Sequence, residues 1–421
     1  MAYLASVVDR WGDLVAFPMP RSPVLLVNTV AGARRVLVEN HGAYTKQTVQ
    51  YGALSLVTGV GLLTADGDEW RRRRRIDQPA FHHSSLDGVA AESVAAAERL
   101  RSAIPRSGGV VDVDHAALRA TLEVVGRTLF GGSVAADGER VVAAVLSALD
   151  VVVARARTPL PVPQWAPTPG NRRLRRAVST LDDASSAVVA HRRAAGLADT
   201  DRDLLSLLLR AADAGDLTPP EVRDELVTMV IAGHETVASA LTWTLHLLAT
   251  HPGAQARLHA ELDGVLAGRS PRWDDLRSLA WTRAAVDEAL RLYPPAWVVT
   301  RRAVADDEVD GVPVPAGTLV IVSTWLLHRR ADVFEHPEEF RPERFLGEAA
   351  RALPRGAYLP FGAGPRLCIG RDFALVEAVL LLAALLRDVE VRPGPGGEPR
   401  VDALVTLRPH GGLPLRVAPR R

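Results

Sequence analysis

Apolar side chains recur three and four positions apart along most of this chain, which is the pattern of helices with one buried face. The spacing predicts helices over residues 88–104, 115–129, 135–155, 171–195, 219–250, 252–267, 281–293 and 373–387. Short apolar runs bounded by turn residues predict strands at 14–17, at 24–27 and within 299–321. No internal repeat and no low-complexity linker divides the chain. The pattern therefore predicts a mainly α fold with a small β portion, in a single domain spanning residues 1–421.

Length and composition narrow the class of protein. With 421 residues, 48% of them hydrophobic, the chain can bury a large core, which excludes disordered chains and disulfide-stabilised mini-domains. The 50 Lys and Arg residues nearly balance 49 Asp and Glu residues, so no nucleic-acid partner is expected. Cys368 is the only cysteine, which fits a reducing compartment, and the N-terminal segment lacks the features of a signal peptide. The longest apolar run, 226–249, contains His234 and Glu235, which favours a buried helix over a membrane span. We expect a cytoplasmic monomer.

A glycine-rich loop, from Phe361 to Gly370, surrounds the single cysteine and leads into an apolar helix. A lone cysteine is most often an inert core residue. Here, however, the glycines let the backbone approach a flat group closely, and the helix start and Arg366 favour a thiolate. A thiolate held against a large planar group is what a thiolate-ligated haem requires. Leu367 excludes a dinucleotide fingerprint, and the lack of further cysteines or clustered histidines excludes structural zinc. A cysteine hydrolase stays open.

Polar residues interrupt the longest predicted helix at its centre, where Gly233 precedes His234, Glu235 and Thr236. A glycine and a polar cluster in an apolar helix lower its stability and indicate a local bend with a function. The simpler alternative is a Thr236 hydroxyl bonded to the carbonyl one turn earlier. A zinc-protease helix is excluded because Ala238 stands where the second histidine would be required.

These segments together resemble the cytochrome P-450 superfamily of haem-thiolate monooxygenases. The loop 361–370 matches that family's haem-binding signature almost position for position, and the likeness extends from about residue 10 to the end. The resemblance implies the cytochrome P-450 fold, with haem b between the long central helix and the helix after the Cys368 loop. It makes Cys368 the axial iron ligand, with Phe361 packed beside the sulfur and Gly370 in the same loop.

The resemblance also implies roles for residues outside the loop. Trp70, Arg74, Arg301 and Arg366 would bind the haem propionates. Gly233 would open a groove for the cosubstrate O2 over the haem, while Thr236 and Glu235 would deliver the protons that cleave it. Glu288 and Arg291, three residues apart, would otherwise be an ordinary surface pair. The resemblance instead makes Glu288, Arg291 and Arg344 a buried cluster with a structural role.

Electrons would come from NAD(P)H indirectly, through a ferredoxin or flavodoxin with its reductase, because no redox module is part of the chain. Five consecutive arginines follow Trp70, and we expect those other than Arg74, Arg72 and Arg73 among them, to attract an acidic electron donor. Lys46 is the only lysine; the alternatives are a carboxylate anchor for the substrate or a solvated surface residue, and we expect it to be solvated.

The substrate is expected to be an apolar small molecule, terpenoid or polyketide-like. The residues expected to line its pocket are Val230, Ala232, Ala296, Trp297, Val298 and Val299. The function predicted is C–H hydroxylation or epoxidation. Two alternatives stay open: oxidative ring closure, coupling or peroxide-driven oxidation by the same haem-thiolate centre, and a non-enzymatic haem gas sensor. The sensor would usually ligate haem through histidine and carry an output module.

Overall fold

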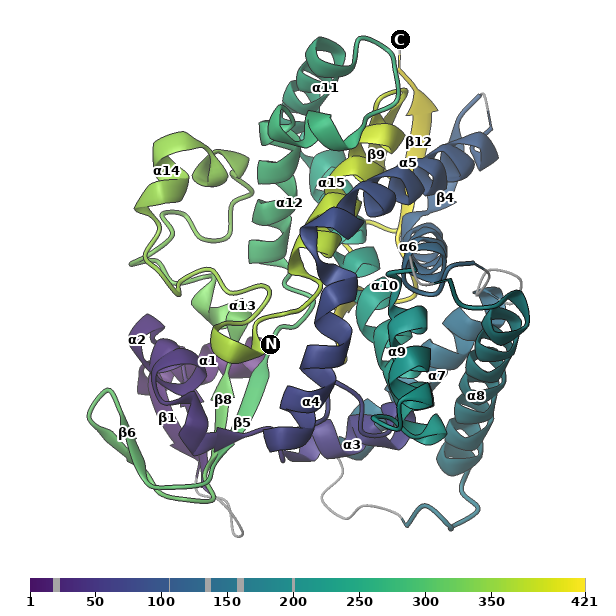
Figure 1. Cartoon of the computed structure of the whole chain (residues 1–421). Coiled ribbons are helices and arrows are strands. Elements are labelled where there is room, and N and C mark those ends of the chain that lie inside the picture. The colour runs from purple at the N-terminus through teal and green to yellow at the C-terminus, as the bar shows by residue number, and fades with distance from the viewer. Residues whose placement is uncertain (18–22, 106, 133–137, 157–162, 199–200, 421) are drawn as a thin grey trace.

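The computed structural model describes residues 1–17, 23–105, 107–132, 138–156, 163–198 and 201–420 (Figure 1). The helices are α1 (Ala2–Trp11), α2 (Val30–Arg34), α3 (Val49–Thr58), α4 (Gly67–Asp77), α5 (Leu86–Ala103), α6 (Val113–Leu129), α7 (Gly138–Ala156), α8 (Pro169–Ala195), α9 (Leu204–Asp213), α10 (Pro219–Thr250), α11 (Pro252–Leu266), α12 (Ala280–Leu292), α13 (Thr324–Leu327), α14 (Gly347–Ala352) and α15 (Arg371–Leu386). The strands are β1 (Leu14–Phe17), β2 (Val24–Val27), β3 (Tyr44–Thr45), β4 (Gly109–Asp112), β5 (Val299–Ala303), β6 (Asp307–Val309), β7 (Val312–Val314), β8 (Leu319–Val322), β9 (Val389–Pro393), β10 (Val401–Ala403), β11 (Leu407–Pro409) and β12 (Pro414–Pro419).

The central helix α10 organises the molecule, with α6, α12 and α15 packed around it (Figure 1). It begins with Pro219 in its first turn and a capping box, in which the Thr218 main-chain N–H donates to Glu221 Oε2 (2.7 Å). Gly233 allows α6 to pack closely, because a Cβ at this position would lie 2.9 Å from Val125 Cγ2. The helix is buried over most of its length, so its glycine and polar residues lie inside the protein.

Helix α15 follows the loop that carries Cys368, and almost all of its residues are buried. The loop itself packs against residues 35–39, where a Cβ on Gly364 would lie 2.1 Å from the Leu37 carbonyl oxygen. Gly364 also has a φ of 67°, which L side chains rarely adopt. Two constraints thus require glycine at this position, and both fix the loop relative to the rest of the chain.

A mixed five-stranded sheet lies at one edge of the molecule (lower left in Figure 1), with strand order β1-β2-β8-β5-β3. Strands β2 and β8 are parallel, and the other neighbours are antiparallel. In the register of β5, Arg301 pairs with Val320 of β8, while Arg302 pairs with Thr45 of β3. This pairing brings Arg301 to the end of the sheet where the chain leaves β3.

The hairpin β10–β11 lies against α10, far from it in sequence. The Leu407 carbonyl oxygen accepts hydrogen bonds from Trp243 Nε1 (3.0 Å) and Ser239 Oγ (2.6 Å) on that helix. These contacts fix the hairpin beside the polar centre of α10.

Most predicted helices are present, and 219–250 has the predicted bounds. Helices α1, α3, α4, α9, α13 and α14 were not among those predicted from apolar spacing. Within the described ranges, no helix combines the length and the apolar character needed to cross a membrane.

Candidate functional site

A cavity of about 600 Å³ lies between α10 and the Cys368 loop. Residues of that loop line one side, Glu235 and Thr236 of α10 line another, and Trp297 lies in the wall formed before β5. The cavity therefore brings together three segments that are separated by 60 residues or more in sequence. Its volume falls in the range of about 300–1,000 Å³ typical of small-molecule sites.

Cys368 lies deep in the protein, but its side chain is accessible from the cavity. Its main-chain N–H donates to the Phe361 carbonyl oxygen (3.0 Å), which closes the loop around the thiol. Burial raises the pKa of this thiol above its usual value, while the Gly370 N–H and the charges of Arg74 and Lys46 lower it. A thiolate here would therefore be stabilised strongly by a metal cation bound in the cavity.

Four cations border the cavity near this loop: Lys46, Arg74, Arg301 and Arg366. Lys46 Nζ donates to the Leu63 carbonyl oxygen (2.9 Å), Arg74 Nη1 to that of Leu367 (3.1 Å) and Arg301 Nη1 to that of Thr300 (2.9 Å). Arg366 forms an ion pair with Asp66, and its guanidinium lies 4.0 Å from the centre of the Trp70 ring.

The solvated position expected for Lys46 is wrong: its side chain is buried and lines the cavity. Burial lowers the pKa of Lys46 well below its usual value, and the nearby charges of Arg301 and Arg366 lower it further. Among the described residues, Asp66 is the one carboxylate that these four cations contact through an ion pair. The cluster is thus electrostatically suited to bind a ligand with two negative charges.

The centre of α10 carries a carboxyl and a hydroxyl group on the cavity wall. Burial raises the pKa of Glu235 to about 7, although Arg408 and the Thr406 hydroxyl oppose the increase. Thr406 Oγ1 donates to Glu235 Oε1 (2.8 Å). Thr236 Oγ1 donates to the Ala232 carbonyl oxygen (2.8 Å), which is the simpler arrangement considered from sequence. His234 points elsewhere: its Nδ1 bonds to the Val230 carbonyl, and burial lowers its pKa to about 4.

The rest of the cavity wall is largely apolar. Of the six residues expected around the substrate, five line the cavity: Ala232, Ala296, Trp297, Val298 and Val299. The expectation for Val230 is wrong, because its side chain is buried in the hydrophobic core. The helical repeat explains the difference: Met229, Ala232 and Thr236 share one face of α10, and Val230 lies off it. Trp297 Nε1 donates to the Leu404 carbonyl oxygen (2.9 Å), which orients the indole ring.

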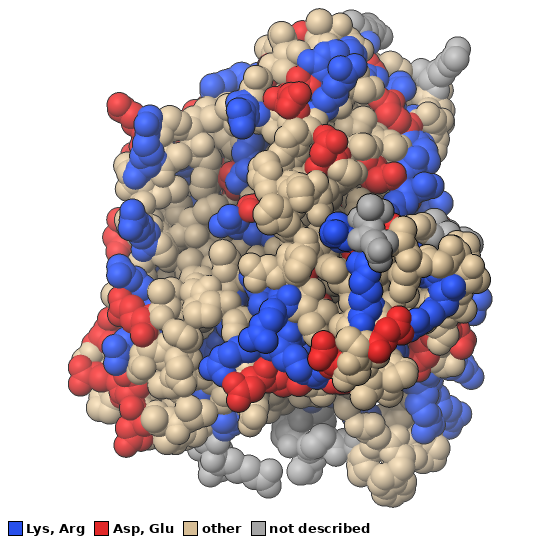
Figure 2. Space-filling view, in the orientation of Figure 1, with Lys and Arg blue, Asp and Glu red and all other residues tan. Residues whose placement is uncertain are grey.

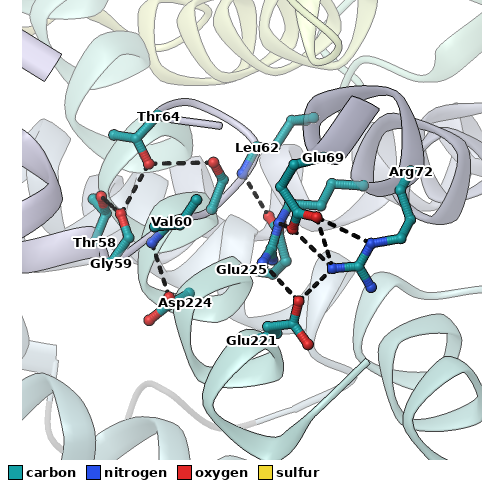
Figure 3. Close-up of polar contacts among 12 residues, drawn as sticks. Thr58, Gly59, Val60, Leu62, Thr64, Glu69, Arg72, Glu221, Asp224 and Glu225 are labelled. Carbon is teal, nitrogen blue, oxygen red and sulfur yellow. Dashed lines mark hydrogen bonds and ion pairs between the residues drawn. The ribbon is translucent and has the colours of Figure 1, made fainter. Parts of the chain in front are cut away.

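Leu62 and Leu63 form one part of the wall, within the segment 58–64 that is held against α10 (Figure 3). The Val60 N–H donates to Asp224 Oδ2 (2.8 Å), and the Leu62 N–H donates to Glu225 Oε2 (3.0 Å). Leu62 lines the cavity, so these two carboxylates position the wall as well as the loop backbone.

Glu288, Arg291 and Arg344 lie together and do not line the cavity. Arg291 Nε and Nη2 donate to the two carboxylate oxygens of Glu288 (2.7 and 2.8 Å), and both side chains are fully buried. Arg344 Nε donates to the same carboxylate (3.2 Å). The three residues connect α12 to the segment before α14.

Comparison with protein-family models matches residues 2–412 to the family described as Cytochrome P450. The chain belongs to the cytochrome P450 family. The cyclooctat-9-en-7-ol 5-monooxygenase of Streptomyces melanosporofaciens is 39% identical over 94% of the chain and 86% of its own length. The pentalenene oxygenase of Streptomyces avermitilis is 36% identical over 99% of the chain and 93% of its length. The crystal structure of CYP175A1 from Thermus thermophilus superposes with a TM-score of 0.80 at 34% identity, covering 100% of this chain and 95% of the other.

These findings confirm the predicted family and fold, and they make this cytochrome P450 a monooxygenase. The family implies a haem-iron cofactor and the use of O2. The residues present fit that group: a thiol is accessible inside the cavity, and three cations beside it, Lys46, Arg74 and Arg301, lack a carboxylate partner among the described residues. Haem carries two propionates that would supply the missing charge.

The expected docking role in this cytochrome P450 is wrong for Arg73, because its side chain is buried, and it stays a prediction for Arg72. Arg73 is only 2% exposed, and its Nη1 donates to Glu225 Oε1 (2.8 Å). Arg72 binds Glu69 (2.8 Å) and Glu221, so its charge is already compensated. In Figure 2, acidic side chains border the group of basic side chains near the centre of this face. These arginines therefore connect α4 to α10.

Sequence reasoning missed three polar residues of the site: Lys46, Thr406 and Arg408. Lys46 carried one signal, because a single lysine among 49 arginines is unusual. Thr406 and Arg408 carried none, since only the folded hairpin places them beside α10.

Proposed function

We propose that this cytochrome P450 inserts one oxygen atom from O2 into an apolar terpenoid, at a C–H bond or as an epoxide. The observation that carries the proposal is the cavity itself, whose lining combines Cys368 with Glu235, Thr236 and largely apolar residues. Relatives named for oxygenation of pentalenene and of cyclooctat-9-en-7-ol support a terpenoid substrate.

Haem bound to the Cys368 thiolate would supply the electron-transfer and oxygen-activating chemistry. In this proposal Cys368 Sγ would hold the iron, and Phe361 and Gly370 hold the loop around the sulfur. Lys46, Arg74 and Arg301 would hold the propionates. Arg366, paired with Asp66 and stacked on Trp70, would complete this basic part of the cavity wall.

Glu235 and Thr236 deliver protons to the cavity. With a pKa of about 7, Glu235 carries a proton at neutral pH in a substantial fraction of molecules. Oε1 accepts the Thr406 hydrogen bond, so the proton resides on Oε2. The Thr236 hydroxyl, which donates to Ala232, passes a proton into the cavity when it rotates away from that carbonyl. The apolar walls exclude bulk water, and so limit proton entry to this pair.

Electrons are supplied by separate proteins, a ferredoxin or flavodoxin with its NAD(P)H-dependent reductase. The substrate contacts Trp297, Val298, Val299 and Ala232, which favour an apolar skeleton over a charged one.

The decisive experiment is the absorption spectrum of the reduced, carbon-monoxide-bound protein, for the parent and for Cys368→Ala. We expect a strongly red-shifted Soret band that the substitution abolishes. Persistence of the band in the variant would refute the ligand assignment. Turnover of a terpene hydrocarbon with ferredoxin, reductase and NADPH should give a product that contains one oxygen atom from ¹⁸O2. Product formation with hydrogen peroxide alone, and none with the reductase system, would contradict O2-dependent monooxygenation.

A further inference from the structure

The segment 163–168, which leads into α8 at the lower right of Figure 1, carries an exposed tryptophan. Trp165 is 80% exposed, which is the highest value among the exposed large hydrophobic side chains of the described residues. One exposed apolar side chain needs no explanation by itself. An indole ring contributes a large apolar area when it is covered, however, so the structure around this one decides whether it marks a contact surface.

Hydrogen bonds to the start of α8 hold this segment in place. Asn171, which is buried, donates through Nδ2 to the main-chain carbonyl oxygens of Pro163 (2.8 Å) and Ala166 (2.8 Å). Thr168 Oγ1 accepts a hydrogen bond from the Asn171 N–H (3.2 Å) and caps the helix. The two carbonyl groups lie on either side of Trp165 in the sequence, so the fold fixes the backbone that presents the indole ring.

The first turns of α8 expose four arginines on one side of the helix: Arg172, Arg173, Arg175 and Arg176. With about 3.6 residues per turn, they lie opposite Leu174 and Ala177, which are buried or nearly so. Within the described ranges, none of the four forms an ion pair with a carboxylate. Asp182 is bound to Arg223 (2.6 Å), and Asp183 lies about 10 Å beyond Arg176 along the helix axis.

This positive charge is local, because the formal net charge of the whole chain is only +1. Like charges three and four residues apart, as in Arg172 with Arg175 and with Arg176, destabilise a helix. An anion bound beside them would remove that cost. Figure 2 shows basic side chains at the lower right, over the end of α8 that Figure 1 places there. The cluster is therefore complementary to a negatively charged surface.

A further apolar side chain and part of the cavity wall belong to helices near the same edge. Helix α3 lies along the lower edge of the molecule in Figure 1 and packs on α7, which in turn packs on α8. Val49, at the start of α3, is 58% exposed. Gln50 of α3 and Val153 of α7 line the cavity. The edge thus combines apolar groups with cations and lies close to the cavity.

The surface of a membrane that contains anionic lipids matches all of these features. Tryptophan rings lie at the level of the lipid headgroups, and clustered arginines bind anionic lipids there. A projecting ring enters a deformable lipid layer directly, whereas a folded partner protein would need a matching recess.

We propose that Trp165 and the four arginines of α8 bind this protein to the surface of a membrane that contains anionic lipids. The guanidinium groups bind lipid phosphates, and the indole ring lies among the headgroups. The chain lies on the membrane and does not cross it. Attachment at this edge brings the cavity close to a layer in which apolar molecules dissolve. The binding needs neither turnover nor substrate, so it does not depend on the proposed function.

The test is co-sedimentation of the haem-loaded protein with sucrose-filled vesicles. Vesicles that contain phosphatidylglycerol and phosphatidylcholine in about equal parts should bind the protein at low salt, and vesicles of phosphatidylcholine alone should bind it about tenfold more weakly or less. Salt at about 0.5 M should weaken the binding to the anionic vesicles, because it screens exposed charges. Equal binding to both kinds of vesicle, or binding to neither, would overturn the proposal.

Two double variants separate this surface from net charge. Arg173→Gln with Arg176→Gln should weaken binding to the anionic vesicles by about tenfold or more. Arg351→Gln with Arg355→Gln is the matched control, since it removes two exposed arginines in and after α14, at the upper left of Figure 1. The control should bind as the parent does. If both double variants lose affinity equally, the binding follows net charge and the proposal fails.

The tryptophan is tested in the same way. Trp165→Ser should weaken the binding by about fivefold or more, because the ring no longer enters the headgroup layer. Trp11→Ser, which changes a 65% exposed tryptophan of α1, is its control and should have no effect. All the substituted side chains are exposed, so each variant should keep the haem spectrum of the parent. Failure to bind vesicles, together with capture of an acidic protein that depends on Arg173 and Arg176, would assign the surface to a protein partner and refute the proposal.

Discussion

Replacement of Arg291 by methionine removes a guanidinium that donates five hydrogen bonds inside the protein. Two go to the Glu288 carboxylate, and three go to the carbonyl oxygens of His328 (2.8 Å), Pro337 (2.6 Å) and Glu339 (3.1 Å). Methionine keeps much of the volume but none of the donors. Glu288 would retain only the Arg344 side chain and one main-chain N–H among the contacts described.

The size of the expected stability loss follows from the burial of this ion pair. Breaking a fully buried ion pair costs about 3–5 kcal/mol, because the remaining charge is left without compensation. Unfolding entropy of about 2 cal/mol/K per residue gives roughly 0.9 kcal/mol/K for a chain of 421 residues. A loss of about 4 kcal/mol therefore lowers the Tm by roughly 4–5 °C.

Thermal unfolding followed by far-UV circular dichroism, with haem content measured in the same samples, checks this value. Arg193→Met is the matched control, because Arg193 also makes two hydrogen bonds to one carboxylate, that of Asp213 (2.7 and 3.0 Å). That pair is exposed (44% and 50%), so its removal should change the Tm far less. If Arg291→Met melts no lower than Arg193→Met, burial does not give the cluster the stabilising role argued here.

Three further predictions follow from the cavity. Lys46→Met should speed the transfer of haem to an acceptor protein by roughly tenfold or more, since a charge-assisted contact of about 1.5–3 kcal/mol is lost. Arg71→Met, which changes an exposed residue, should leave the rate of haem loss unchanged. Glu235→Gln should stabilise the fold above pH 7 but not at pH 4, because the pKa of Glu235 is raised in the folded state and its ionisation therefore costs stability progressively from about pH 4.5 to 7. Equal differences in Tm between variant and parent at both pH values would refute this prediction. Gly61→Ala should lower the free energy of unfolding by about 1–3 kcal/mol, because the new Cβ would lie 2.0 Å from a side-chain oxygen of α10. Gly52→Ala, which has open space around it, should not destabilise the protein, and chemical denaturation measures both variants.

The sequence predicted the features that depend on local signals. The bounds of α10 follow from its proline start, its capping residues and its apolar face, all within the helix itself. The Cys368 loop was equally accessible, because its glycines and cysteine are contiguous.

The errors concern partners that are distant in sequence. A run of five arginines is typical of a solvated surface, yet Arg73 is buried and donates a hydrogen bond to Glu225, which lies 152 positions later. The same holds for Arg408, whose partner Asp114 is 294 positions away. Val230 was misplaced for a geometric reason: it lies off the face of α10 that carries Met229, Ala232 and Thr236 and reaches the cavity.

The single lysine inside the cavity has a consequence for chemical labelling. Reagents that acylate amines have two targets in this chain, the N-terminal α-amino group and Lys46. With its ammonium form disfavoured by burial, Lys46 is a good nucleophile whenever a reagent can enter, and haem in place would block that entry. The mass of a peptide bearing the acyl group then reports, molecule by molecule, how much of a preparation lacks its cofactor.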